Sequence, residues 1–243
     1  MTDAVYILGT GSKWQDNELR YSLRSLEKYV TGVRNVYVVG ECPEWLTGVI
    51  HLPCKDEKPG NLVYKERNIM LKILRACAEP QLSKEFLFIN DDHFFLAPVE
   101  AETYPNYYLE NIPGMILWRN INDQYQASLK QTVAALKKTN LYDLFFDVHY
   151  PIIYNKAKFV SIMDAYDWNL PYGYVIKSLY ANCMQLEGTP LEDDCKINGP
   201  VSVDGLHEYT DPKMLFSTGN QMDFEELETF LQWKFPDASK YEN

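Results

Sequence analysis

Short apolar runs alternate with amphipathic stretches over the first 90 residues, and this alternation restricts the fold more than any other feature. Residues 4–8 (AVYIL), 35–40 (NVYVVG) and 86–89 (FLFI) are rich in β-branched and aromatic side chains, as buried strands are. Between them, apolar residues recur at helical spacing over 17–30 and 62–77. This order predicts an α/β domain of Rossmann-like type, with a mostly parallel sheet and helices on both faces.

The second half of the chain carries weaker signals and is predicted to be irregular. Asp223 followed by Glu226 resembles a capping box and predicts a last helix through about residue 233. We find no linker, internal repeat or low-complexity block, so we predict one domain over 1–243. The remaining predictions are strands at 49–52, 115–118 and 215–217, helices at 124–138, 156–166 and 174–185, and a loop at 187–212.

Charge and cysteine usage narrow the class of protein. The 23 basic and 34 acidic side chains give a net charge of −11, which disfavours broad binding to nucleic acid or to an anionic membrane. No apolar run approaches the roughly 20 residues of a transmembrane helix, and the N-terminus lacks the features of a signal peptide. Five cysteines without a CxxC pair favour reduced thiols, so we expect a cytoplasmic protein without a membrane span.

Two adjacent carboxylates interrupt an aromatic stretch at FINDDHFF, residues 88–95. If 86–89 is an interior parallel strand, Asp91 and Asp92 lie at its carboxyl end, where open α/β sheets bind ligands. Adjacent carboxylates repel each other unless a cation compensates, and oxygen ligands suit Mg²⁺ or Mn²⁺. The alternative is an Asn/Asp turn between two strands. The aromatic flanks favour the metal, and we expect one aspartate to bind it directly.

A glycine pair follows the first strand, at Gly9, Thr10 and Gly11. A strand followed by GxG is typical of dinucleotide binding, and Glu41 ends the second strand where a ribose-binding acid would lie. However, bulky Trp14 stands where a third glycine is needed, and several residues intervene before the helix. The loop is therefore predicted to let its backbone approach a nucleotide, or to be a plain turn.

One of four histidines, His149, precedes a Tyr-Pro pair that favours an extended or turn conformation. That restriction suits a positioned acid, base or ligand. A hydrogen-bonded, half-buried histidine would explain the pattern equally well. The acidic stretch 192–194 is predicted as a solvated loop.

Several stretches together resemble the Stealth family of sugar-phosphate transferases, which includes bacterial capsule-polymer phosphotransferases and the lysosomal N-acetylglucosamine-1-phosphotransferase. Residues 17–29 (NELRYSLRSLEKY) look like the family's ELRYSLRSIEKY helix, 43–46 (PEWL) like its PxWL, and 86–95 like its FLYFNDDMFL. Residues 149–151 and 217–220 are shorter matches to its later regions, in the family's order. The firm resemblance covers about residues 17–96, and the shorter matches extend it to about 222.

The resemblance implies a glycosyltransferase-A-type fold, a nucleotide-sugar donor (usually a UDP-sugar), and dependence on Mg²⁺ or Mn²⁺. Residues 1–100 would form the nucleotide-binding half and 101–243 the acceptor-side half. Arg20 and Arg24, one helical turn apart, are candidates for phosphate contact. His149 is the candidate that activates the acceptor hydroxyl, with Asp91 and Asp92 as the other catalytic residues. The implied donor-binding residues are Gly9, Thr10, Gly11, Arg20, Arg24 and Asn68, and the implied metal ligands are Asp91, Asp92 and Asn220.

Two departures from the family leave open whether the sugar or the sugar-1-phosphate is transferred. In either case the expected acceptor is a hydroxyl on a glycan or another compound. Residues 8–12 (LGTGS) replace the opening TWVDG, and residues 64–69 (YKERNI) replace the usual segment before NDD. The alternatives are a transferase acting on modified bases in DNA, which the charge disfavours, a non-catalytic metal-dependent glycan-binding module, and an NAD-dependent oxidoreductase.

Overall fold

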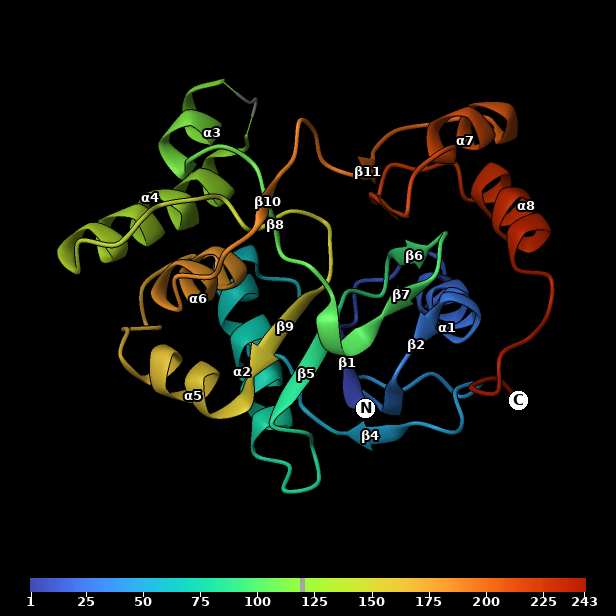
Figure 1. The fold of residues 1–243 in the computed structure, drawn as a ribbon, viewed down its shortest axis with the longest axis horizontal. Helices are drawn as coiled ribbons and strands as arrows, with labels where there is room; N and C mark the ends of the chain where they lie inside the picture. Colours follow the sequence, from blue (N-terminus) through green and yellow to red (C-terminus); the bar gives the residue numbers. More distant parts are fainter. Residues whose placement is uncertain (119–120) are drawn as a thin grey trace.

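The central element is a five-stranded sheet in the order β4-β3-β1-β5-β9 (Figure 1). A computed structural model describes residues 1–118 and 121–243. Strands β1, β3, β4 and β5 run parallel, and β9 is antiparallel to β5 at one edge. The predicted, mostly parallel sheet is therefore confirmed, and β5 is an interior strand. The bounds are β1 (Thr2–Leu8), β3 (Val33–Gly40), β4 (Ile50–Leu52), β5 (Glu85–Ile89) and β9 (Ile152–Asn155).

Helices cover both faces of this sheet, because alternate side chains of each strand point to opposite sides. Ala4 and Tyr6 of β1 pack with Leu23 of α1 (Asn17–Tyr29), whereas Val5 packs with Ile73 of α2 (Lys65–Cys77). The α2 face also carries α5 (Lys156–Asp164) and α6 (Ile176–Cys183). The amphipathic spacing at 17–30 and 62–77 thus predicted both helices correctly, except that residues 62–64 form a separate short turn, η1 (Leu62–Tyr64).

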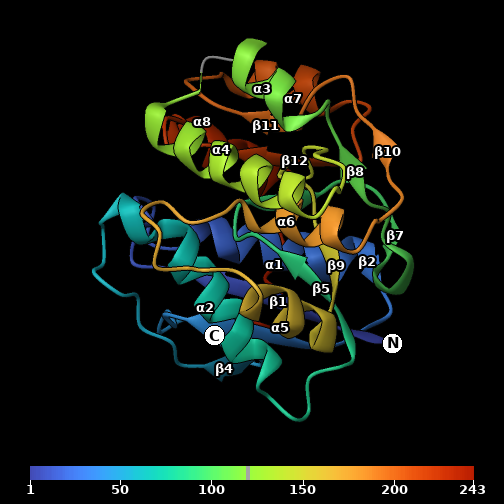
Figure 2. The same ribbon diagram turned by 90° about the vertical axis from the view of Figure 1, so that its left-hand side faces the viewer.

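A second layer lies above the sheet and contains α3, α4, α7 and α8 (Figure 2). The strand predicted at 115–118 is wrong, since these residues belong to α3 (Ile112–Trp118). The Asn111 side chain accepts a hydrogen bond from Gly114 N at 2.8 Å, which starts a helix that the short apolar run did not reveal. Helix α4 (Asp123–Lys138) agrees with the prediction.

The segment 187–212 is only partly loop, which corrects the prediction. It contains β10 (Thr189–Pro190), β11 (Lys196–Ile197) and α7 (Val203–Thr210), whose cap is Ser202. Strand β10 pairs with β8 (Tyr107–Tyr108), and β2 (Val30–Thr31) pairs with β7 (Val99–Glu100), which leads into the short turn η2 (Ala101–Thr103). These strands of two residues each carry too little periodicity for detection from sequence.

A small sheet, β11-β12-β6, continues the chain from the carboxyl end of β5. Strand β6 (His93–Phe95) pairs antiparallel with β12 (Leu215–Thr218), and Phe94 lies opposite Phe216. The cap predicted for the last helix, α8 (Phe224–Lys234), is confirmed by Asp223, which accepts from Glu226 N at 3.4 Å. The Glu226 carboxylate instead accepts from Val203 N at 2.8 Å and so ties α8 to α7.

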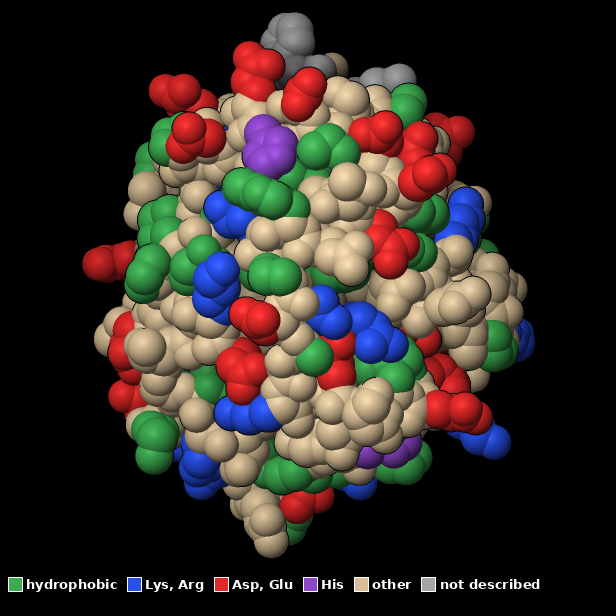
Figure 3. All heavy atoms as spheres, turned by 90° about the vertical axis from the view of Figure 1, so that its right-hand side faces the viewer, with side chains coloured by type: hydrophobic (Ala, Val, Ile, Leu, Met, Phe, Trp, Pro, Cys, Tyr) green, Lys and Arg blue, Asp and Glu red, His purple; other side chains and the backbone are tan. Residues whose placement is uncertain are grey.

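The C-terminal segment after α8 returns to α1 and reaches the edge of the large sheet near β4 (Figure 1). Basic and acidic side chains are mixed on the face that includes α8 (Figure 3), so this face shows no extended patch of one sign. Over the described residues, none of the helices combines the length and the apolar character needed to cross a membrane.

Candidate active site

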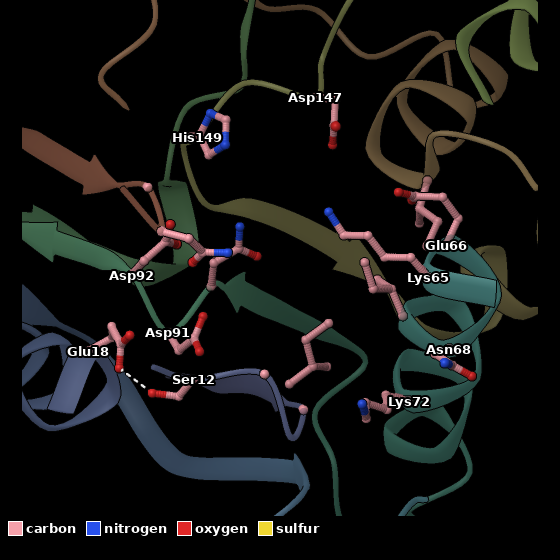
Figure 4. Close-up of a pocket in the computed structure, with 18 of the residues that line it drawn as sticks. Ser12, Glu18, Lys65, Glu66, Asn68, Lys72, Asp91, Asp92, Asp147 and His149 are labelled. Atoms are coloured by element: carbon pink, nitrogen blue, oxygen red, sulfur yellow. Dashed lines mark hydrogen bonds between the residues drawn. The ribbon is translucent and has the colours of Figure 1, made fainter. Parts of the chain in front are cut away.

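A cavity of about 540 Å³ opens at the carboxyl ends of β1 and β5, beneath the second layer (Figure 4). This is the edge of the sheet where the strand order predicts ligand binding. Most of the residues predicted for the site meet in its wall although they come from distant parts of the chain. They are Gly9, Thr10, Gly11, Asn68, Asp91, Asp92, His149 and Asn220.

The turn between β5 and β6 holds Asp92 firmly and leaves one of its oxygens unused. Asp92 Oδ2 accepts from Ser217 Oγ at 2.9 Å, which fixes the carboxylate against β12. Asp92 Oδ1 is buried and has no hydrogen-bond partner among the described residues. A buried carboxylate oxygen without a partner is costly, so the site is built to receive a cation or a donor.

Asp91 and Glu18 add negative charge beside Asp92. Burial, reinforced by the charges of Asp92 and Glu18, raises the pKa of Asp91 to about 8. Burial also raises the pKa of Glu18, whose carboxylate accepts from Ser12 Oγ at 2.9 Å. The raised pKa of both groups reflects burial next to other carboxylates, as expected at a site that lacks a compensating positive charge.

These oxygens suit a hard divalent cation such as Mg²⁺ or Mn²⁺ in their chemistry. Asp91, Asp92 and the amide of Asn220 line the same cavity, and Asp92 offers its unused oxygen. Within residues 1–118 and 121–243, no three His, Cys, Asp or Glu side chains form a ready-made metal site. A divalent cation held here would have to draw its remaining ligands from phosphate oxygens and water, as is usual for Mg²⁺.

His93, between the acids and the core, does not face the cavity. It is fully buried, its Nε2 has no partner among the described residues, and its Nδ1 accepts from Asn90 N at 3.4 Å. Burial holds the pKa of His93 well below its ordinary value, so the ring is neutral. His93 thus packs beneath the turn that carries the aspartates.

His149 is oriented by a carboxylate that the sequence analysis assigned to a solvated loop. Asp194 Oδ2 lies 2.6 Å from His149 Nδ1, and Asp194 Oδ1 accepts from His149 N at 2.9 Å. Burial alone would raise the pKa of Asp194, but the hydrogen bonds from His149 lower it below its ordinary value. Residues 192–194 do form a loop, and Glu192 and Asp193 are exposed as predicted. The predicted solvation is wrong for Asp194 alone, because its carboxylate bonds to His149 and the Cys195 thiol donates to His149 O at 2.9 Å.

Lys196, the first residue of β11, fixes the tautomer of His149. Lys196 Nζ lies 3.0 Å from His149 Nε2 and 3.9 Å from Asp92 Oδ2. Because an ammonium group only donates, Nε2 is the accepting nitrogen and Nδ1–H donates to Asp194. The lone pair of Nε2 is therefore engaged by Lys196, and the ring can act as a general base only when Lys196 moves away from it.

Lys177 of α6 fixes the backbone on both sides of His149. Its buried ammonium donates to Val148 O and to Tyr150 O, each at 2.9 Å. Burial lowers the pKa of Lys177, and the nearby charges of Asp147 and Asp194 oppose that shift. The only sequence signal for Lys177 was a lysine within the mostly apolar stretch 174–181.

Helix α2 also lines the cavity with three charged side chains, Lys65, Glu66 and Lys72. Lys72 pairs with Asp56, and the Lys65 side chain extends into the pocket (Figure 4). Asn68 accepts from Glu57 N at 2.8 Å and donates to Glu57 O at 3.1 Å, so its amide holds the preceding loop in place.

Arg20 and Arg24 do not line the cavity, which contradicts their predicted contact with phosphate. Both pair with the buried carboxylate of Glu242, at 3.0 and 2.7 Å, and Arg20 also lies over the Trp45 ring. The helical spacing placed the two arginines correctly on one face of α1. That face is covered by the C-terminal segment, whose position no local pattern indicates.

The glycine loop after β1 lines the cavity together with a smaller adjoining hollow that also contains Glu41. Ser12 Oγ accepts from Trp14 N at 3.1 Å and from Asp16 N at 2.9 Å, which shapes the turn before α1. Trp14 stacks on Tyr21 and Phe224. This packing differs from a dinucleotide-binding turn, in which a glycine allows close helix–strand contact.

Residues 13–111 match the model of the Stealth protein CR2, conserved region 2. The chain is 30% identical over 104 residues to the capsular polysaccharide phosphotransferase of Neisseria meningitidis serogroup B, covering 39% of this chain and 26% of that protein. It is 31% identical over 101 residues to the human N-acetylglucosamine-1-phosphotransferase subunits alpha/beta, covering 35% and 7%. A capsular polysaccharide phosphotransferase, LcbA of Aeromonas hydrophila, is 25% identical over 166 residues, covering 63% and 45%. The matched part thus spans less than half of each of these relatives.

Among solved structures, the galactosyltransferase LgtC in complex with donor and acceptor sugar analogs is similar in fold. The TM-score is 0.54 at 11% sequence identity, over 98% of both chains. At that identity the likeness shows the fold alone. It confirms the predicted glycosyltransferase-A-like architecture.

Proposed function

We propose that this Stealth-family chain, which carries conserved region 2 on a glycosyltransferase-type fold, transfers a sugar-1-phosphate from a nucleotide-sugar donor to an acceptor hydroxyl. One observation carries the proposal: Asp92 presents a buried, unpartnered oxygen in the same cavity as the accepting nitrogen of His149. An acid pair for a cation and a base for a hydroxyl are the two parts that this reaction needs. Similarity to proteins named phosphotransferases favours sugar-1-phosphate over the sugar alone.

The donor is proposed to bind with its nucleoside against Gly9, Thr10 and Gly11 and its diphosphate over the carboxyl end of β5. A UDP-sugar is the donor that we propose. Asp91, Asp92 and Asn220 would hold Mg²⁺ or Mn²⁺, which neutralises the diphosphate when bound and assists departure of the leaving group. Lys65 and Lys196 replace Arg20 and Arg24 as the proposed cationic contacts to phosphate, because their side chains line the cavity.

The proposed chemistry is a displacement at the β-phosphorus. The acceptor oxygen forms a bond to that phosphorus, the bond from it to the bridging oxygen breaks, and UMP leaves. His149 Nε2 takes the proton of the acceptor hydroxyl, and Asp194 stabilises the imidazolium that forms. A bound diphosphate draws Lys196 towards its own negative charge, which frees Nε2 for this step.

The acceptor is proposed to be a hydroxyl compound such as a glycan. The relatives named above are phosphotransferases of polysaccharides or of N-acetylglucosamine, so a base in DNA is not proposed as acceptor. A cytoplasmic location stays a proposal, resting on the odd number of cysteines.

The test is a panel of nucleotide-sugars incubated with the protein, with and without Mn²⁺ or Mg²⁺, followed by chromatography of the nucleotides. We expect metal-dependent release of UMP from at least one UDP-sugar. UDP as the product would mean transfer of the sugar alone. Binding without any consumption of donor would leave the glycan-binding module as the better account.

A further inference from the structure

One end of the cavity is lined by polar groups that the described part of the protein leaves unsatisfied. Glu66, the second residue of α2, is only 9% exposed, and its carboxyl group makes no hydrogen bond or ion pair within residues 1–118 and 121–243. Tyr154 of β9 is fully buried, lines the same cavity, and has a hydroxyl without a hydrogen-bond partner in that part of the chain. A hydroxyl buried without a partner, like that of Tyr154, costs about 1–3 kcal/mol unless a ligand satisfies it.

A hydrogen-bonded pair stands beside these two groups. Tyr125 of α4 donates its hydroxyl to Asp147 Oδ2 at 2.5 Å, and both residues line the cavity. Asp147 and Glu66 come from separate elements on the side of the pocket away from Asp91 and Asp92, with Lys65 reaching between them (Figure 4). Asp147 is also two residues before His149, so a ligand held there would lie beside the proposed base.

The chemistry of these four side chains indicates what they can bind. Burial, with the charge of Asp147, raises the pKa of Glu66 to about 8, so at neutral pH its carboxyl group both donates and accepts. The Tyr154 hydroxyl can do the same, and Asp147 accepts. Sugar hydroxyls also donate and accept. Lys65 offsets the charge of Asp147 at this end of the cavity, so a neutral ligand keeps the charges balanced, whereas a sugar carboxylate would add an unbalanced negative charge.

We propose that Glu66, Tyr154, Tyr125 and Asp147 form a subsite for the hydroxyl groups of an uncharged sugar ring. The ring belongs either to the donor or to the acceptor, and the choice between these two sources rests on the proposed function. The hydroxyl-binding chemistry itself rests on the four side chains alone.

The test uses the variant Tyr154→Phe, with Tyr37→Phe as matched control. Tyr37 is also a fully buried tyrosine of the large sheet with an unpartnered hydroxyl, but it lies outside the cavity. Neither substitution breaks a hydrogen bond within the described part of the protein, so both variants should fold. Calorimetric titrations compare UDP, UDP-glucose, UDP-galactose, UDP-N-acetylglucosamine and UDP-glucuronate. Methyl glucoside and methyl galactoside are titrated without nucleotide.

If the ring is the donor's, at least one neutral UDP-sugar binds about 10-fold more tightly than UDP, and Tyr154→Phe removes most of that gain, while Tyr37→Phe keeps it. If the ring is the acceptor's, Tyr154→Phe leaves the affinities for the UDP-sugars unchanged. It then weakens the binding of the methyl glycosides by a similar factor. In either case Glu66→Gln, which keeps a donor and an acceptor, should retain more affinity than Glu66→Leu.

Equal binding by Tyr154→Phe and Tyr37→Phe in both series would overturn the subsite, as would binding of UDP-glucuronate as tight as that of the neutral sugars. Failure of UDP to bind would overturn the proposed donor instead. The methyl glycosides would then still report on the subsite by themselves.

Discussion

At the scale of single residues, the two carboxylate oxygens of Asp92 have different roles. Its Oδ2 is fixed by Ser217, which leaves Oδ1 buried and free for a ligand. Two acids between phenylalanines looked contradictory in the sequence, because both flanks belong to buried strands. The structure resolves this, since the turn delivers the acids to a cavity while His93 packs beneath it.

For Asp92 we predict that Asp92→Asn lowers donor turnover by about 10²-fold or more, because the charge opposite the diphosphate is lost. The amide keeps an acceptor for Ser217, so the thermal unfolding curve should change little. Steady-state release of nucleotide measures the effect, and the exposed carboxylate variant Asp164→Asn is the control. Turnover near wild type would remove Asp92 from the site.

For His149 we predict that His149→Ala lowers kcat by about 10²–10⁴-fold, the usual contribution of a general base. Asp194→Asn should give a smaller loss and shift the pH profile, because it changes only the orientation and charge balance of the ring. An unchanged kcat in His149→Ala would show that another group takes the proton.

Glu66 gives a prediction about stability. Its pKa is about 8 in the folded protein against 4.5 ordinarily, so the folded state retains a proton that the unfolded state releases. The free energy of unfolding therefore falls as pH rises from about 4.5 to 8. Glu66→Gln removes this pH-dependent loss of stability. The Tm of the variant should exceed that of wild type by at least about 2–4 °C at pH 8, with little difference at pH 4.5. A pH-independent difference would contradict the assignment.

At the scale of elements, α1 is held by the end of the chain. Arg24 and Arg20 pair with Glu242, whose carboxylate is 3% exposed and also accepts from Ser239 N at 2.8 Å. Burial would raise the pKa of Glu242, but these hydrogen bonds lower it to about 2. The stabilisation is therefore complete above about pH 4.5 and is lost as pH falls towards 2.

We predict that Glu242→Gln lowers the free energy of unfolding by about 1–3 kcal/mol at pH 7. Urea unfolding at several pH values measures it, and the difference from wild type should shrink as pH falls from 4.5 to 2. Donor turnover at pH 7 below the Tm should stay near wild type, because the contact lies outside the cavity. A large loss of turnover in a folded variant would mean that α1 contributes to the active site.

The elements also show which patterns are readable from sequence. Strands and helices of the first 90 residues follow local periodicity, and the Asp223 cap follows local turn chemistry. In the small sheet, β6 pairs with β12 across more than 100 residues, and β11 has only two residues, so no local pattern marks it. The assignment of 115–118 failed because Asn111, outside the apolar run, starts the helix.

At the scale of the whole molecule, the cavity residues also divide into those that local sequence patterns predict and those that they do not. The acids after β5, the glycine loop and His149 were predictable, because strand ends of a parallel sheet meet at one edge and His149 precedes Tyr-Pro. Lys177, Lys65, Glu66 and Lys72 reach the cavity only through tertiary packing, and tertiary packing also brings Asp194 to His149. The two arginines were misassigned for the converse reason, since a distant segment covers them.

The most direct test of the account follows the fate of the β-phosphorus of the donor. A UDP-sugar carrying labelled phosphorus at the β position is incubated with the protein, the divalent metal and a hydroxyl acceptor, and the products are separated. The account predicts that the label leaves with the sugar as a phosphodiester or sugar phosphate, with UMP unlabelled. Label retained in UDP, at matching sugar transfer, would contradict it.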